Sequence, residues 1–152
     1  MGWSRLSFGI HKGKTLPEVM FKDPDWFFWA YENKKLNIEM MMNEAEELFR
    51  KARAIRLPGK YANSMQVAYL RDITTGKFAG MQLVVKGSYV NAFSSCSDVI
   101  DLSFPRSLKS YDKQAYKSVI SMLKQIFWGN SRCRINRLKA EEFFNNNANF
   151  KL

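Results

Sequence analysis

The sequence contains few of the residues that build metal sites and disulfide frameworks. Cysteine occurs twice and histidine once in 152 residues. Cys96, Cys133 and His11 cannot supply the four ligands of an ordinary structural zinc site, and two cysteines do not make a disulfide framework. The acidic residues show no spacing typical of a calcium loop. We therefore expect no metal ion and no other cofactor.

Long hydrophobic runs and low-complexity tracts are also missing. No window of about 18 apolar residues occurs, so the sequence predicts no membrane-spanning helix. The first residues lead into no apolar run of the length that a signal peptide needs. These absences favour a cytoplasmic protein without a membrane partner.

Recognisable catalytic patterns are absent as well. Residues 94–98 (Ser-Ser-Cys-Ser-Asp) offer nucleophiles, but the only histidine is far away in the sequence and nothing positions a base or an oxyanion hole. A phosphate loop of the Gly-x-x-x-x-Gly-Lys-Ser/Thr type does not occur, because Gly9 and Gly13 lie one residue too close. We expect no catalytic residue, and therefore a protein that is not an enzyme.

The chain carries a large excess of positive charge. Lys and Arg number 24 against 14 Asp and Glu, a formal net charge of +10. Such a charge repels itself in the folded state, and a polyanion relieves this cost by releasing condensed counterions. Nucleic acid is the commonest polyanion partner. The alternatives are an acidic protein, acidic lipid, or a basic protein with no polyanion partner at all.

The first basic region is a glycine-containing turn over residues 7–14. Gly9 and Gly13 predict a short strand and a tight turn, since glycine tolerates a positive φ. We expect the backbone N–H groups of this turn to approach phosphate, Lys12 and Lys14 to add charge, and His11 to stack on a base or donate to an oxygen. The alternative is a plain turn with solvated lysines.

The second basic region runs from residue 104 to residue 139, where nine bases face one acid. Its densest part, residues 132–137, follows a Trp-Gly-Asn sequence, and arginine beside an aromatic residue suits single-strand binding. The alternative is a solvated basic helix face. From the two regions together we predict these nucleic-acid-binding residues: His11, Lys12, Gly13, Lys14, Lys113, Lys117, Lys124, Arg132, Arg134, Arg137 and Lys139.

Hydrophobic patterning predicts an α+β fold, a small antiparallel sheet with several packed helices. Asp23 and Pro24 suit the start of a helix that carries Trp26, Phe27, Phe28 and Trp29. These aromatic residues surround the helix, so we expect two or three in the core and one as an exposed stacking platform.

Further helices are expected over 36–56, 111–128 and 135–145, with a frayed tail after the asparagines at 145–147. A hairpin is expected over 65–86, with further strands at 89–93 and 99–104. We expect residues 1–35 to form a basic, aromatic module that packs with an α+β remainder over 36–152.

Residues 8–19 (Phe-Gly-Ile-His-Lys-Gly-Lys-Thr-Leu-Pro-Glu-Val) and 23–29 (Asp-Pro-Asp-Trp-Phe-Phe-Trp) resemble a known pattern. The segment over residues 7–34 is similar to the small C-terminal domain of exodeoxyribonuclease X-type proteins, although Ile10 stands where that family commonly has a basic residue. The resemblance implies engagement of DNA rather than RNA. It does not imply nuclease activity, because the Asp-x-Glu pair that opens such a metal-dependent exonuclease is missing.

The sequence therefore predicts a nucleic-acid-binding accessory protein that contacts the phosphate backbone through basic loops. A compact chain with a nuclease-associated segment suggests a phage- or plasmid-encoded protein. Two alternatives stay open: a protein-interaction factor that blocks or recruits an acidic host protein, for example in an anti-defence role, and a nuclease of unrecognised type.

Overall fold

The computed structural model describes residues 2–88, 94–108 and 113–152, the last range without the side chain of Lys113. The described residues form six α-helices and two small antiparallel sheets, which confirms the predicted α+β class. The helices are α1 (Leu16–Lys22), α2 (Pro24–Glu32), α3 (Glu39–Ala52), α4 (Gly59–Ala62), α5 (Lys113–Trp128) and α6 (Arg137–Asn145), and the strands are β1 (Ile55–Arg56), β2 (Met65–Arg71), β3 (Phe78–Val85), β4 (Ser95–Ser97) and β5 (Val99–Ile100).

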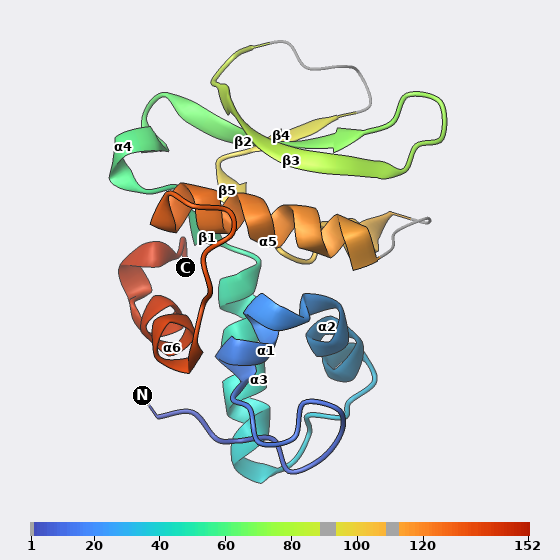
Figure 1. The fold of residues 1–152 in the computed structure, drawn as a ribbon, viewed down its shortest axis with the longest axis vertical. Coiled ribbons are helices and arrows are strands. Elements are labelled where there is room, and N and C mark those ends of the chain that lie inside the picture. Colours follow the sequence, from blue (N-terminus) through green and yellow to red (C-terminus); the bar gives the residue numbers. More distant parts are fainter. Residues whose placement is uncertain (1, 89–93, 109–112) are drawn as a thin grey trace.

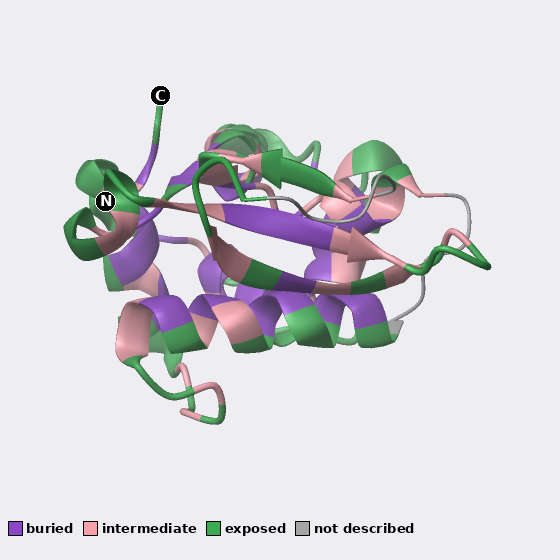
Figure 2. Cartoon of the chain, turned by 90° about the horizontal axis from the view of Figure 1, so that it is seen from above, coloured by how far each residue is buried: buried purple, intermediate pink, exposed green. Residues whose placement is uncertain are grey.

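The larger sheet lies at one end of the molecule with the short helix α4 beside it, and α1, α2, α3 and α6 lie at the other end (Figure 1). Its strand order is β3-β2-β4, and the central strand β2 buries Val67, Ala68 and Tyr69. Helix α5 runs along β3, between this sheet and the group formed by α1, α2, α3 and α6 (Figure 1). Figure 2 shows β2 as the buried strand between more exposed neighbours. In the second sheet, β1 pairs with β5.

The N-terminal segment packs into the same hydrophobic core as the rest of the chain. Trp3, Phe27 and Phe28 belong to one continuous buried cluster with residues of α3, α5 and α6. The Trp3 Nε1 group donates to Asn145 Oδ1 at 3.0 Å, near the other end of the chain. Burying each large apolar side chain contributes about 1.5–3 kcal/mol, so this shared core holds residues 2–35 against the remainder.

Several predicted elements are confirmed. The hairpin pairs β2 with β3 from Met65 opposite Val85 onward. Helix α2 begins at Pro24, and the Asp23 carboxylate accepts a hydrogen bond from the Trp26 N–H at 3.3 Å, as an N-cap does. Helices α5 and α6 lie within the ranges predicted for them.

Other boundaries differ from the prediction. Helix α3 ends at Ala52 rather than Arg56, because Ile55 and Arg56 pair with β5. The strand predicted over 99–104 ends at Ile100, and Pro105 lies in a 3-10 helix over Phe104–Ser107 instead. The strand predicted over 89–93 lies outside the described residues.

The frayed C-terminal tail was a wrong prediction. After α6 the chain forms a short 3-10 helix, and Phe150 is buried and bridges to Ile55. The Lys151 N–H then donates to the Ala54 carbonyl at 2.8 Å. An aromatic residue close to the end of the chain therefore ties it to the core.

Candidate nucleic-acid interface

The glycine-containing turn over residues 7–14 is tight, with φ angles of 78° at Gly9 and 89° at Gly13. Three of its N–H groups bond within the chain: Lys12 N–H donates to the Gly9 carbonyl at 3.2 Å, Gly13 N–H to the Leu6 carbonyl at 2.8 Å and Lys14 N–H to the His11 carbonyl at 3.1 Å. Those three amides are therefore not available to phosphate, and a phosphate contact by the other N–H groups of the turn stays a prediction. The expected short strand is reduced to a single bridge between Arg5 and Thr15.

His11 connects this turn to the start of α2. Its side chain is buried, its Nε2 lies 3.0 Å from Asp23 Oδ2, and its ring stands edge-on to Trp26 at 5.3 Å. The other Asp23 oxygen caps α2 through the Trp26 N–H. A buried ring held in this way is not the exposed stacking surface that the sequence predicted. His11 instead fixes the position of the turn relative to α2.

The two predicted basic regions meet along one groove. One hollow of about 620 Å³ and another of about 520 Å³ share Phe21, Lys22 and Lys124 and therefore adjoin each other. We call them together the basic groove and define it by the cations that line it: Lys14, Lys22, Lys117, Lys124, Arg132 and Arg134.

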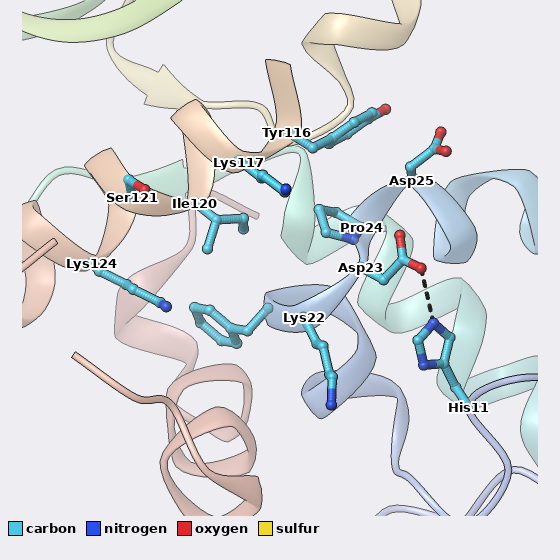
Figure 3. Close-up of a pocket in the computed structure, with 11 residues that line it drawn as sticks. His11, Lys22, Asp23, Pro24, Asp25, Tyr116, Lys117, Ile120, Ser121 and Lys124 are labelled. Atoms are coloured by element: carbon cyan, nitrogen blue, oxygen red, sulfur yellow. Dashed lines mark hydrogen bonds and ion pairs between the residues drawn. The ribbon is translucent and has the colours of Figure 1, made fainter. Parts of the chain in front are cut away.

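Helices α1 and α5 form the two sides of the basic groove. Lys117 and Lys124 are seven residues apart on α5, two helical turns, so they project from the same face. In Figure 3 they extend from α5, whereas Lys22 extends from the end of α1. Phe21 is buried between them and packs edge-on against Trp128 and Phe143. The apolar contacts of Phe21 therefore set the distance between the two rows of cations.

The carboxylates at the groove are engaged within the protein. Asp23 binds His11, Asp25 accepts from Arg106 at 2.7 Å, and Glu18 accepts from the Thr15 N–H at 3.1 Å. Over residues 2–88, 94–108 and 114–152, none of the six groove cations has a carboxylate within ion-pair distance. The six cations outnumber the three carboxylates that line the same hollows, Glu18, Asp23 and Asp25, so the groove presents net positive charge to whatever enters it.

The remaining predicted site residues lie elsewhere. Lys12 and Gly13 are exposed on the turn beside the groove but do not line it. Arg137 binds Glu141 at 3.2 Å, and Lys139 lines a separate small hollow. The side chain of Lys113 lies outside the described residues.

Sequence reasoning missed Lys22 together with the helix that positions it. The signal was present: Thr15 and Glu18 form a capping box, the pattern Thr-x-x-Glu that marks a helix start. Reading it would have placed a helix from residue 16 and Lys22 at its last turn.

The aromatic cluster on α2 divides as predicted. Phe27 and Phe28 are fully buried, Trp26 is half-buried and Trp29 is 43% exposed. Phe27 and Phe28 contact each other edge-on at 5.4 Å, inside the core. The exposed platform expected from the sequence is thus Trp29, and its stacking role stays a prediction.

Comparison of the chain with protein-family models, curated proteins and solved structures finds no match. The resemblance of residues 7–34 to the exodeoxyribonuclease X C-terminal domain therefore stays a prediction from the residues themselves. Within the part of the chain that the structure describes, no helix is long and apolar enough to cross a membrane, and no group of three or more His, Cys, Asp or Glu residues could hold a metal ion.

Proposed function

We propose that this protein binds nucleic acid by holding the phosphate backbone in the basic groove. The observation that carries the proposal is the convergence of six cations from the turn, α1, α5 and the 132–134 loop, with no carboxylate partner among the described residues. Each cation that neutralises a phosphate displaces condensed counterions, so the groove gains free energy from a polyanion. Two arginines at one end add forked donors that suit phosphate oxygens.

The groove accounts for affinity for the phosphate backbone of a nucleic acid but not for recognition of a base sequence. Phosphate contacts position a protein on its ligand without reading bases. We propose DNA as the preferred ligand because residues 7–34 resemble a module associated with a DNA exonuclease. The role that fits these features is that of a non-enzymatic accessory protein acting on nucleic acid in the cytoplasm.

The salt dependence of binding tests this function. Lys22, Lys117 and Lys124 are changed together to Gln, and affinity for a labelled oligonucleotide is measured by fluorescence anisotropy at several salt concentrations. The slope of log affinity against log salt should fall by about 0.7 per lost contact on single strands and about 0.9 on duplexes. Three lost contacts should therefore lower the slope by about 2 to 3.

A matched control removes the same charge from elsewhere on the surface. Lys60, Lys77 and Lys151 are exposed and do not line the groove, so their joint change to Gln should leave the slope nearly unchanged. Equal slopes for the groove variant and the wild type would refute the groove as the phosphate site. A wild type with no affinity for polynucleotides at near-physiological salt would favour an acidic protein partner instead.

A further inference from the structure

Another hollow, of about 650 Å³, adjoins the basic groove and has a different character. It shares Asp23 and Asp25 with the groove, so the two are neighbours on the surface. Its apolar lining comes from Phe8, Ile10, Trp26 and Trp29, and we call it the aromatic cleft. The groove attracts anions, whereas this cleft offers flat apolar surface.

The glycine turn and α2 hold the rings of the aromatic cleft in place. Trp26 and Trp29 lie 6.5 Å apart with their planes tilted by 49°, and Phe8 lies 6.2 Å from Trp26. The Gly9 backbone lies against Trp26, since a Cβ at Gly9 would sit 3.4 Å from that ring. Ile10 is 75% exposed and Trp29 43% exposed, so large apolar surfaces face solvent at the cleft. Clustered exposed apolar surface of this kind marks a binding site.

The charges around the aromatic cleft compensate one another. Asp25 accepts from Arg106 at 2.7 Å, and Asp23 is held by His11. Lys35 and Arg106 offset the two carboxylates of the lining, so the cleft favours neither a cation nor an anion. Lys35 and Arg106 on the rim repel an ammonium group, which disfavours use of the cleft as an aromatic cage for a cation. A neutral planar ring is the ligand that suits the cleft.

We propose that the aromatic cleft binds an unpaired nucleobase, stacked on Trp29, of the strand whose phosphates lie in the basic groove. This inference rests on the proposed function and adds to it a preference for single strands, because bases in a duplex are already stacked and paired. Stacking on an aromatic side chain tolerates every base, since each base has a π-face. The site therefore adds affinity for single strands without adding sequence specificity.

The experiment compares two single-stranded ligands that differ only in their bases. One is a thymidine oligonucleotide and the other an abasic sugar-phosphate oligonucleotide of the same length and charge. Wild type should bind the thymidine strand roughly 5- to 150-fold more tightly, the range that corresponds to about 1–3 kcal/mol for one stacked base. Trp29→Leu should abolish this difference while it leaves affinity for the abasic strand unchanged, and Trp29→Tyr should retain most of it.

Tryptophan fluorescence gives a second measurement. The thymidine strand should quench the wild-type emission, and Trp29→Leu should lose that quenching although three tryptophans remain. Equal wild-type affinity for the two strands would overturn the nucleobase site and leave the proposed function standing. A Trp29→Leu variant that keeps the full preference for the thymidine strand would likewise overturn the nucleobase site and leave the proposed function standing. Absence of binding to either strand would overturn both the proposed function and the nucleobase site.

Discussion

At the scale of single residues, the Tyr69 hydroxyl joins the two sheets. It donates to the Val99 carbonyl at 3.2 Å and accepts from the Asp101 N–H at 2.7 Å. The Tyr69 ring stacks on Phe104 at 4.1 Å. Burial raises the pKa of Tyr69 well above its ordinary value of 10.0, because the phenolate would lose its hydration. The neutral hydroxyl is therefore part of the folded structure.

This pKa shift predicts a loss of stability at alkaline pH. Below pH 10, Tyr69 is protonated in both the folded and the unfolded state, and its contribution is complete. As the pH rises above 10, the unfolded chain loses this proton while the folded chain keeps it, so the free energy of unfolding falls. Tyr69→Phe should lower that free energy by about 1–3 kcal/mol at neutral pH, because two partly buried backbone groups lose their partner.

Urea unfolding of the wild type and Tyr69→Phe between pH 7 and 11 checks this prediction. The difference between the two proteins should shrink as the pH rises. The pKa of Tyr31 is also raised, by burial and by the Glu46 carboxylate, but it titrates in both proteins and cancels in the comparison. A difference that stays constant across this range would contradict the assigned role of Tyr69.

The roles of individual residues depend on partners that the sequence does not reveal. His11 was predicted from its basic neighbours as an exposed contact, yet Asp23 and Trp26 bury it. Those partners lie 12 and 15 residues away, and only the packing of the turn on α2 brings them together. The exposure of one of the four aromatic residues on α2 was easier to anticipate, because helical periodicity alone forbids four consecutive residues from all facing the core. That Trp29 is the exposed one depends on packing.

At the scale of secondary-structure elements, Lys51 links α3 to the end of α6. Its side chain is 3% exposed, and its Nζ donates to the Phe144 carbonyl at 2.7 Å and lies 3.0 Å from Glu47. Phe144 is in the last turn of α6, where carbonyls lack helical partners and the helix dipole favours a cation. The buried lysine thus caps one helix from another.

Changing Lys51 separates this hydrogen bond from the packing of the side chain. Lys51→Met keeps the aliphatic stem and should lower the free energy of unfolding by about 1.5–3 kcal/mol, the contribution of a hydrogen bond to a charged group. Lys51→Ala should cost more, because the stem leaves a cavity in addition. Urea denaturation measures both values. Equal stability of Lys51→Met and wild type would show that the cap contributes nothing.

The elements that could be predicted are those whose signals are local. The hairpin has a glycine-containing turn between two segments rich in β-branched and aromatic residues, and α5 has a long apolar face. Both elements could therefore be predicted from the sequence. The C-terminal boundary of α3 was predicted too late, because Ile55 and Arg56 pair with β5, some 45 residues later in the sequence. The anchored tail was missed for the same kind of reason, since the place of Phe150 in the core depends on residues far away in the sequence.

At the scale of the whole molecule, the net charge of +10 is organised by the fold. The turn, α1, α5 and the 132–134 loop are separate in sequence and become one groove through the packing of α1 against α6 and of α2 against α5. The sequence indicates that basic residues gather in two regions. It cannot indicate that these regions face each other, because that depends on how the helices pack.

The fold also distinguishes two arginines that the sequence treats alike. Arg134 lines the basic groove, whereas Arg137 binds the Glu141 carboxylate at 3.2 Å. Arg134→Gln should therefore lower the salt slope of nucleic-acid binding by about 0.7–0.9, the value for one lost phosphate contact. Arg137→Gln removes the same charge three residues away and should leave the slope nearly unchanged, because its charge is already offset and it lies outside the groove. Each variant is the control for the other, since both alter the long-range field equally. Equal slope changes would mean that total charge decides binding, and that the basic groove has no special part in it.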